Sequence, residues 1–392
     1  TIQSLQPGNY DVRLQTNNSQ PWHKTLAVKP SLVTFTGQVR LWPITNHQPT
    51  KIYEAVDYTL QSPNGQNLLY HISSGINYGW WLLNLTSGKS LFLNRQTAAT
   101  YTKLEWSPNS RQILINQNTT TGPTIQIMDL EKNTLELVTL PTAATNLIVH
   151  WGKNESNLYF SNHTELYQFN LSNETVKSIW RGKLIDFKIN NEVAFIITTN
   201  QNSSSTLKLL NLNNLQIIPT TDGPMATTNL TFLNHSDAWV TLFAEDRHTL
   251  YLLRSPLINQ EYIKTLPEVT GLDWSINPDQ ILLTNNFELW RYTISTNKLD
   301  LILRMSKPLT AARLYQNEPY ILFASDNNLW TVELDTRDQQ QQWLLATYPK
   351  PIKNLFIDQS GKTVTVQTAD ALYRVNLSPT ITLNQPAVPP TN

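Results

Sequence analysis

The sequence predicts an all-β protein, an eight-bladed β-propeller preceded by a small, truncated β-sandwich. A strand-sized phrase recurs along the chain, made of an apolar residue, an aromatic residue, any residue, an apolar residue, Asn or Asp, and Leu, as in 166–171. Its second position falls in turn on Trp81, Gln126, Tyr167, Lys208, Tyr251, Trp290, Trp330 and Tyr373, so the copies lie 39 to 45 residues apart. Almost no segment shows a sustained helical period, which predicts few and short helices.

A period of about 40 residues with several short strands in each copy is typical of a propeller, because one four-stranded blade cannot cover both of its faces alone. The predicted blades lie near 56–95, 101–140, 145–180, 184–219, 229–266, 269–304, 309–346 and 352–383. Seven blades remain possible if the first or last copy is incomplete. Either 381–383 or 51–54 could supply the outer strand of the last blade, and the second choice would close the propeller.

The composition excludes several classes of function. The chain of 392 residues is 40% hydrophobic with a formal net charge of zero, which argues against nucleic acid or anionic lipid as a partner. Only 15% of its residues are charged, against about 25% in an average soluble domain, and this suits an extracytoplasmic protein. With no cysteine, disulfides, thiolate catalysis and cysteine-based metal sites are excluded. The chain begins at Thr1 without an initiator Met, so we expect a membrane anchor or signal peptide before it.

The first 42 residues lack the repeat and contain Pro7-Gly8-x-Tyr10 and then Trp22-x-Lys24. These pieces resemble the PEGA domain, a small β-sandwich of bacterial surface proteins, although the opening strand of that family is missing. The propeller is similar to the TolB-like and WD40-like repeats of bacterial envelope proteins, through turns such as 106–109, Trp-Ser-Pro-Asn. The repeat, the resemblance and the prolines at the end together divide the chain into a partial PEGA-like sandwich in 1–42, the propeller in 43–383 and a Pro-rich tail in 384–392. The resemblance implies little about function.

The repeated aromatic position is interpreted as packing between blades, since both faces of a blade are buried. Gln126 and Lys208 are its two exceptions, and either one could face a wetter edge or make a structural hydrogen bond.

No motif predicts catalysis, a cofactor or a metal. The seven histidines, His150 among them, are scattered without metal-ligand spacing, and no HExxH, calcium-loop, phosphate-binding or GxSxG motif occurs. The candidate ligand-binding residues lie instead at the longer loops of blades one, four and five, and they are Tyr78, Trp80, Asp222, Asp246 and Arg247. Each of them could equally serve in ordinary loop packing, and the charged run 245–248 could be a solvated hairpin.

The sequence therefore predicts a non-catalytic platform at the cell surface or in the envelope, which binds or displays protein or carbohydrate partners. One alternative is a glycan-processing or hydrolytic propeller enzyme with its site in the central channel. That alternative predicts that carboxylates, or a histidine and a carboxylate, lie within hydrogen-bonding reach and have shifted pKa values. A channel lined by Ser, Thr, Asn and backbone would instead favour the platform. A second alternative is a module that assembles into a surface layer.

Overall fold

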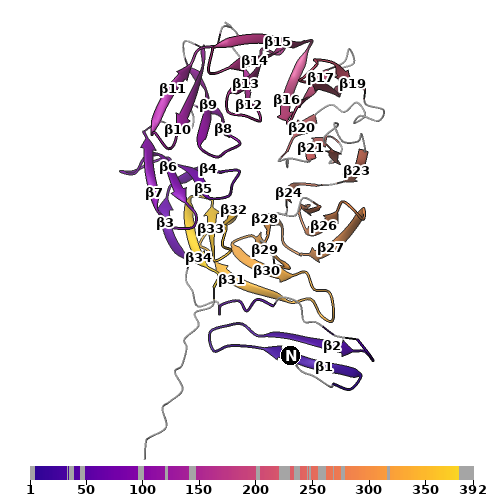
Figure 1. Ribbon diagram of the computed structural model, residues 1–392. Helices are drawn as coiled ribbons and strands as arrows, with labels where there is room; N and C mark the ends of the chain where they lie inside the picture. Colours follow the sequence, from indigo (N-terminus) through magenta and orange to yellow (C-terminus); the bar gives the residue numbers. More distant parts are fainter. Residues whose placement is uncertain are drawn as a thin grey trace, which may run out of the picture. The chain divides into compact units, whose positions relative to one another are not determined.

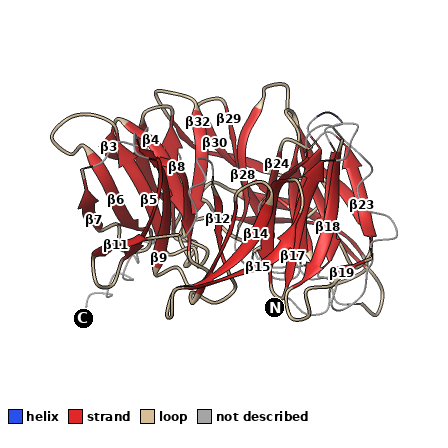
Figure 2. Ribbon diagram, turned by 90° about the horizontal axis from the view of Figure 1, so that it is seen from above, coloured by secondary structure: helices blue, strands red, loops and turns tan. Residues whose placement is uncertain are grey.

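The computed structural model describes residues 5–32, 34, 39–44, 49–95, 101–119, 122–140, 147–199, 204–219, 230–233, 239–244, 246, 249–254, 262–267, 269–274, 279–315 and 318–378. The chain divides into two compact units. The two-blade unit contains residues 1–54 and 307–392, and the six-blade unit contains residues 55–306. Strands and loops make up the described residues, which contain no α-helix (Figure 2). Accordingly, no helix in this part of the chain is long and apolar enough to cross a membrane.

Six four-stranded antiparallel sheets form the six-blade unit, and in each of them the strands follow chain order (Figure 1). The first three blades are β4 (Val56–Gln61), β5 (Asn67–Ile72), β6 (Gly79–Asn84) and β7 (Ser90–Asn94); β8 (Tyr101–Trp106), β9 (Gln112–Thr119), β10 (Gly122–Asp129) and β11 (Thr134–Val138); and β12 (Ile148–Trp151), β13 (Asn157–Ser161), β14 (Glu165–Asn170) and β15 (Thr175–Arg181).

The next three blades are β16 (Leu184–Asn190), β17 (Val193–Thr199), β18 (Ser205–Asn211) and β19 (Ile217–Ile218); β20 (Leu230–Phe232), β21 (Trp239–Ala244), β22 (Thr249–Arg254) and β23 (Tyr262–Pro267); and β24 (Gly271–Trp274), β25 (Gln280–Thr284), β26 (Glu288–Thr293) and β27 (Lys298–Arg304).

The two-blade unit contains the last two blades and an N-terminal hairpin. The seventh blade is β28 (Leu309–Leu314), β29 (Tyr320–Ser325), β30 (Asn328–Glu333) and β31 (Gln342–Thr347), and the eighth is β32 (Ile352–Ile357), β33 (Thr363–Thr368), β34 (Ala371–Asn376) and β3 (Thr50–Glu54). The eight-bladed prediction is thereby confirmed. Because β3 pairs with β34, residues 51–54 supply the outer strand of the last blade, which is the choice that joins the two ends of the repeat.

The N-terminal hairpin pairs β1 (Gly8–Leu14) with β2 (Trp22–Val28) in a sheet of two strands. Among the described residues, the predicted β-sandwich is represented by this hairpin alone. The resemblance to a PEGA domain and the three-part division of the chain stay predictions.

The blades are buried on both faces, as their sequences require. The second strand of the fourth blade, β17, reads VAFIITT, and six of its seven residues are buried. Such a continuous apolar run is typical of a strand that is covered from both sides. Neighbouring blades are also joined by repeated hydrogen bonds, since the indole N–H of Trp106 donates to the carbonyl of Leu60, and that of Trp151 donates to the carbonyl of Glu105.

The fourth position of the recurring phrase is buried in every copy, and so is its first. The first position holds Trp80, Ile125, Leu166, Leu207, Leu250, Leu289, Leu329 and Leu372. At the aromatic position, Tyr251 and Tyr373 are buried as predicted, whereas the other four aromatic residues are partly buried. Of the exceptions, Gln126 is partly buried and Lys208 is exposed. The aromatic ring therefore completes the packing in most blades, while the apolar side chains at the first and fourth positions fill the core.

Candidate functional site

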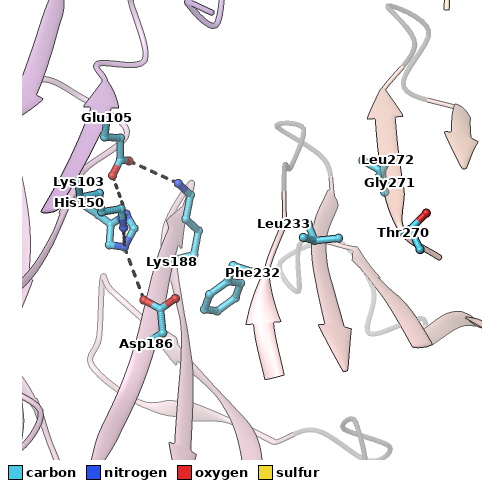
Figure 3. A pocket seen from close by; sticks show the side chains of 10 residues that line it. All are labelled: Lys103, Glu105, His150, Asp186, Lys188, Phe232, Leu233, Thr270, Gly271 and Leu272. Atoms are coloured by element: carbon cyan, nitrogen blue, oxygen red, sulfur yellow. Dashed lines mark hydrogen bonds and ion pairs between the residues drawn. The ribbon is translucent and has the colours of Figure 1, made fainter. Parts of the chain in front are cut away.

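A cavity of about 450 Å³ opens among the first strands of five consecutive blades in the six-blade unit. Its lining consists of Lys103, Glu105, His150, Asp186, Lys188, Phe232, Leu233, Thr270, Gly271 and Leu272 (Figure 3). The first five are called the first-strand cluster below, and Phe232, Leu233 and Leu272 are called the apolar wall. The volume lies within the range of about 300–1,000 Å³ that is usual for ligand pockets.

Strand alternation places the first-strand cluster on the cavity side of its blades. On β16, the buried Phe187 and Ile189 alternate with the partly exposed Asp186 and Lys188, so the two charged side chains share one face. The contacts of β12 with both β8 and β16 bring His150 between the other two blades. His150 is 4% exposed, and its ring packs edge-on against Phe187 at 5.0 Å.

The imidazole of His150 lies at the centre of the first-strand cluster. Its Nδ1 is 2.8 Å from the Glu105 carboxylate, while the ammonium group of Lys103 donates to its Nε2 over 2.9 Å. These partners fit one proton on Nδ1 and one proton shared between Nε2 and Lys103, so that Lys103 and His150 together carry one positive charge. Asp186 lies 3.8 Å from Nε2, and Lys188 donates to Glu105 over 3.4 Å. The five side chains thus connect three blades.

The charges of this cluster hold both carboxyl groups in the ionised form. Burial on its own would raise the pKa of Glu105, but His150, Lys188 and Lys103 outweigh burial and lower that pKa well below its ordinary value. The pKa of Asp186 is also lowered, because the contacts with His150 and Lys103 exceed the effect of its burial. Burial lowers the pKa of Lys103, although Glu105 and Asp186 partly offset this.

This arrangement limits the chemistry of the cavity. A carboxyl group that acts as a general acid near neutral pH needs a raised pKa, and both carboxyl groups here have lowered ones. A histidine that acts as a general base needs an accessible nitrogen, but Lys103 already donates to Nε2 of His150. Within the described ranges, no group of three or more His, Asp or Glu side chains could hold a metal ion. The cluster is therefore better suited to presenting charges than to transferring protons.

Two of the five residues predicted from the sequence lie near each other in the first blade. Trp80, on β6, is 3% exposed and belongs to the core that the first two blades share. Tyr78 is partly buried and lines a separate open hollow with Arg95 and residues 74–76. His71 connects them, since its ring lies 4.9 Å from that of Trp80 and 5.6 Å from that of Tyr78. A ligand-binding role for Tyr78 and Trp80 stays a prediction.

The other three predicted residues are not brought to the cavity. Asp246 is described as an exposed residue of the fifth blade and is absent from the cavity lining. Asp222 and Arg247 lie outside the described residues.

The sequence reasoning missed the first-strand cluster, although one signal could have revealed part of it. Three first strands end in a Trp at the turn, at positions 106, 151 and 274, and the residue directly before that Trp is Glu105 in the second blade, His150 in the third and Asp273 in the sixth. Alignment of the blades on this Trp places charged or titratable side chains at one equivalent position. Such a set of polar residues at equivalent strand positions indicates a shared surface in a propeller.

Comparison with known proteins supports the fold and no more. No model of a protein family matches the chain, and no curated protein is similar enough to match it. Among solved structures, the Dos1 propeller is similar with a TM-score of 0.55 and 10% identity, over 84% of this chain and 95% of that one. The C-terminal WD40 domain of Sif2 is similar with a TM-score of 0.55 and 14% identity, over 84% of this chain and 98% of that one. A eukaryotic initiation factor is similar with a TM-score of 0.56 and 10% identity, over 96% of each chain. The fold is therefore that of a WD40-like β-propeller.

Proposed function

We propose that this protein is a non-catalytic binding platform, located at the cell surface or in the envelope, which holds protein partners at the first-strand cluster. The observation that carries the proposal is a cavity with balanced, ionised charges on one side and the apolar wall on the other. Protein surfaces combine these two kinds of side chain, and a rigid sheet edge presents them at little entropic cost. The low fraction of charged residues supports the extracytoplasmic location.

The cavity favours a protein over a carbohydrate partner. Sugar sites usually offer aromatic faces for stacking, and the only aromatic carbon ring in the described lining is that of Phe232. A lining of Ser, Thr, Asn and backbone would have favoured the platform over the enzyme, but charged and apolar side chains dominate the lining of this cavity. Binding through paired charges is a more specific form of the platform hypothesis than the sequence predicted.

The test compares partners captured by the wild-type protein and by a cavity variant, Asp186→Asn with Lys188→Gln. Envelope and soluble extracts of the source cells would be passed over each immobilised protein, and the bound proteins would be quantified by mass spectrometry. Lys177→Gln is the matched control, since Lys177 is exposed on β15 and lies outside the cavity. We expect at least one partner to be reduced tenfold or more by the cavity variant and kept by the control. An identical set of partners on all three proteins would refute the proposal.

A hydrolytic enzyme is the second candidate, because one observation favours it. The distance of 2.8 Å between His150 and Glu105 satisfies the geometric criterion that the enzyme alternative set. Glycosidic, peptide and ester substrates would be assayed with the wild-type protein and with Glu105→Gln. Turnover that the substitution abolishes, while a thermal melt shows an intact fold, would replace the platform hypothesis with this one. Cell fractionation would test the proposed location independently.

A further inference from the structure

Asp186 and Lys188 present an acceptor and a donor of opposite charge on one strand face. No bulge separates them, since Asp186 is the partner of Ile197 and Lys188 that of Phe195 in the β16–β17 ladder. Residues two apart in a strand are separated by about 6.5 to 7 Å, as the rise is about 3.3 Å per residue. The strand therefore fixes the spacing of the two Cα atoms and the face that the two side chains share.

Both side chains keep hydrogen-bonding capacity that the described residues do not use. The Oδ1 atom of Asp186 accepts from the backbone N–H of Phe187, while no described residue donates to Oδ2. Lys188 contacts Glu105 through one long bond of 3.4 Å, and an ammonium group has three N–H donors. Their side chains are 35% and 19% exposed, respectively, so a ligand can reach both.

The charge balance selects the kind of ligand. Within the first-strand cluster, the two ionised carboxylates face two positive charges, one on Lys188 and one shared by Lys103 and His150, so a ligand with a net charge would leave one member of the cluster without compensation. A ligand with one positive and one negative group preserves the balance. Its positive group would lie at Asp186 and its negative group at Lys188.

An extended peptide offers this pair at the required spacing. Alternate residues of an extended chain point to the same side with Cα atoms about 6.5 to 7 Å apart, which matches the strand spacing of Asp186 and Lys188. The residue between them points away from β16 toward the rest of the cavity, where Figure 3 shows Leu233 and Leu272, with Phe232 beside Asp186 and Lys188. We propose, on the basis of the platform function above, that the cavity binds an extended peptide segment in which a basic and an acidic side chain flank an apolar one.

The first experiment measures binding of short capped peptides to the full chain by calorimetry. Acetyl-Lys-Leu-Glu-amide and acetyl-Glu-Leu-Lys-amide are both complementary, because they can lie along β16 in opposite directions. Acetyl-Lys-Leu-Lys-amide and acetyl-Glu-Leu-Glu-amide are the like-charge controls, and acetyl-Lys-Ser-Glu-amide tests the apolar wall. We expect at least one complementary peptide to bind at least tenfold more tightly than either like-charge peptide and several-fold more tightly than the Ser peptide. Equal binding of all five peptides, or of none, would overturn the proposal.

The second experiment reverses the charge at Asp186, which should change the peptide that the cavity binds most tightly. In Asp186→Lys, both charges on the strand face are positive. The variant should therefore bind the complementary peptides at least tenfold more weakly than the wild-type protein does, and it should bind acetyl-Glu-Leu-Glu-amide more tightly. A purely structural role of Asp186 would not produce a gained affinity, and a misfolded variant could not show one. Glu136→Lys is the matched control, since Glu136 is exposed on β11 and has no part in the cavity. Loss of the complementary peptides without this gain would overturn the proposal.

The two proposals fail separately. If capture of a partner depends on Asp186 and Lys188 but no peptide binds, the platform function stands and the peptide class is wrong. If neither capture nor peptide binding depends on these side chains, both proposals are wrong.

Discussion

Two ion-pair networks of the molecule differ in how completely their charges are used. In the two-blade unit, the ammonium group of Lys24 on the hairpin lies 2.6 Å from the carboxylate of Glu333, and the two side chains are 0% and 2% exposed. Lys24 also donates to the backbone carbonyls of Asp335, Arg337 and Gln339, over 3.0, 2.7 and 3.2 Å. Every donor of this ammonium group has a protein acceptor, so the loop after β30 encloses it.

The first-strand cluster of the six-blade unit contains the same kinds of group in an incomplete arrangement. The carboxylate of Glu333 accepts hydrogen bonds from Trp22 and Gln341 besides its ion pair, whereas Asp186 and Lys188 keep unused positions that face a cavity. A saturated network fixes a structure, because removal of any member leaves a buried group unsatisfied. A network with unused donors and acceptors is suited to a ligand. A structural network and a ligand-binding network therefore differ in how many of their hydrogen-bonding groups are already paired, and not in the number of their charges.

The largest effect that tests this comparison is expected from Lys24→Met. The substitution leaves the buried carboxylate of Glu333 without its cation, and loss of one partner of a buried ion pair typically costs about 3–5 kcal/mol. We expect a clear fall in the free energy of unfolding and faster proteolysis of the hairpin, measured by urea denaturation and limited trypsin digestion.

The control for this substitution is Lys29→Met, because Lys29 is exposed just after β2. Its denaturation midpoint should match that of the wild-type protein. Equal stability of Lys24→Met and the control would show that the saturated network does not hold the hairpin in place.

Glu105→Gln should have an intermediate effect. The amide keeps the shape of the side chain but removes the charge that compensates Lys188, and a buried partner left unsatisfied costs about 1–3 kcal/mol. Urea denaturation at neutral pH measures this loss. A variant as unstable as Lys24→Met would mean that the first-strand cluster is as structural as the network of Lys24 and Glu333, and that the contrast between the two networks is wrong.

The pH dependence of stability gives a further test of Glu105. Its pKa in the folded protein lies below the unfolded value of about 4.3, so its ionised form stabilises the fold above that pH. This contribution is lost as the pH falls below about 4.3 toward the folded pKa. Glu105→Gln lacks it at every pH, and the stability difference between the variant and the wild-type protein should therefore shrink between pH 5 and pH 3. A difference that stays constant or grows on acidification would contradict the lowered pKa.

The propeller could be predicted almost completely from the sequence, because it repeats one local pattern. The copies of the phrase with Leu166 and Leu289 gave the period, and the turn residues gave the strand limits. The pairing of β3 with β34 could only be offered as one of two choices, since a short strand such as 50–54 carries no signal that names its partner. Pairing between distant segments depends on the three-dimensional path of the chain.

The candidate site could not be predicted, because it is assembled across blades. Glu105, His150 and Asp186 are far apart in the sequence, and no single strand shows that their side chains meet. The candidate residues were instead predicted at loops, since binding residues often lie on loops. The long loop before Trp80 led to a residue that is buried in the core. Equivalent positions in successive first strands carried more information than loop length did.

The smallest change in stability is expected from Asp186→Asn, and it separates the two kinds of network most sharply. The side chain is 35% exposed, and partly exposed ion pairs contribute about 0–1 kcal/mol, so urea denaturation should give nearly the wild-type result. Binding of the complementary peptides should nevertheless fall at least tenfold, since the amide cannot compensate a positive side chain. A residue of a saturated network would show the reverse pattern, with a large loss of stability. Equal losses of stability in Asp186→Asn and Glu105→Gln would place Asp186 among the structural charges, and unused hydrogen-bonding capacity would then be no guide to function in this fold.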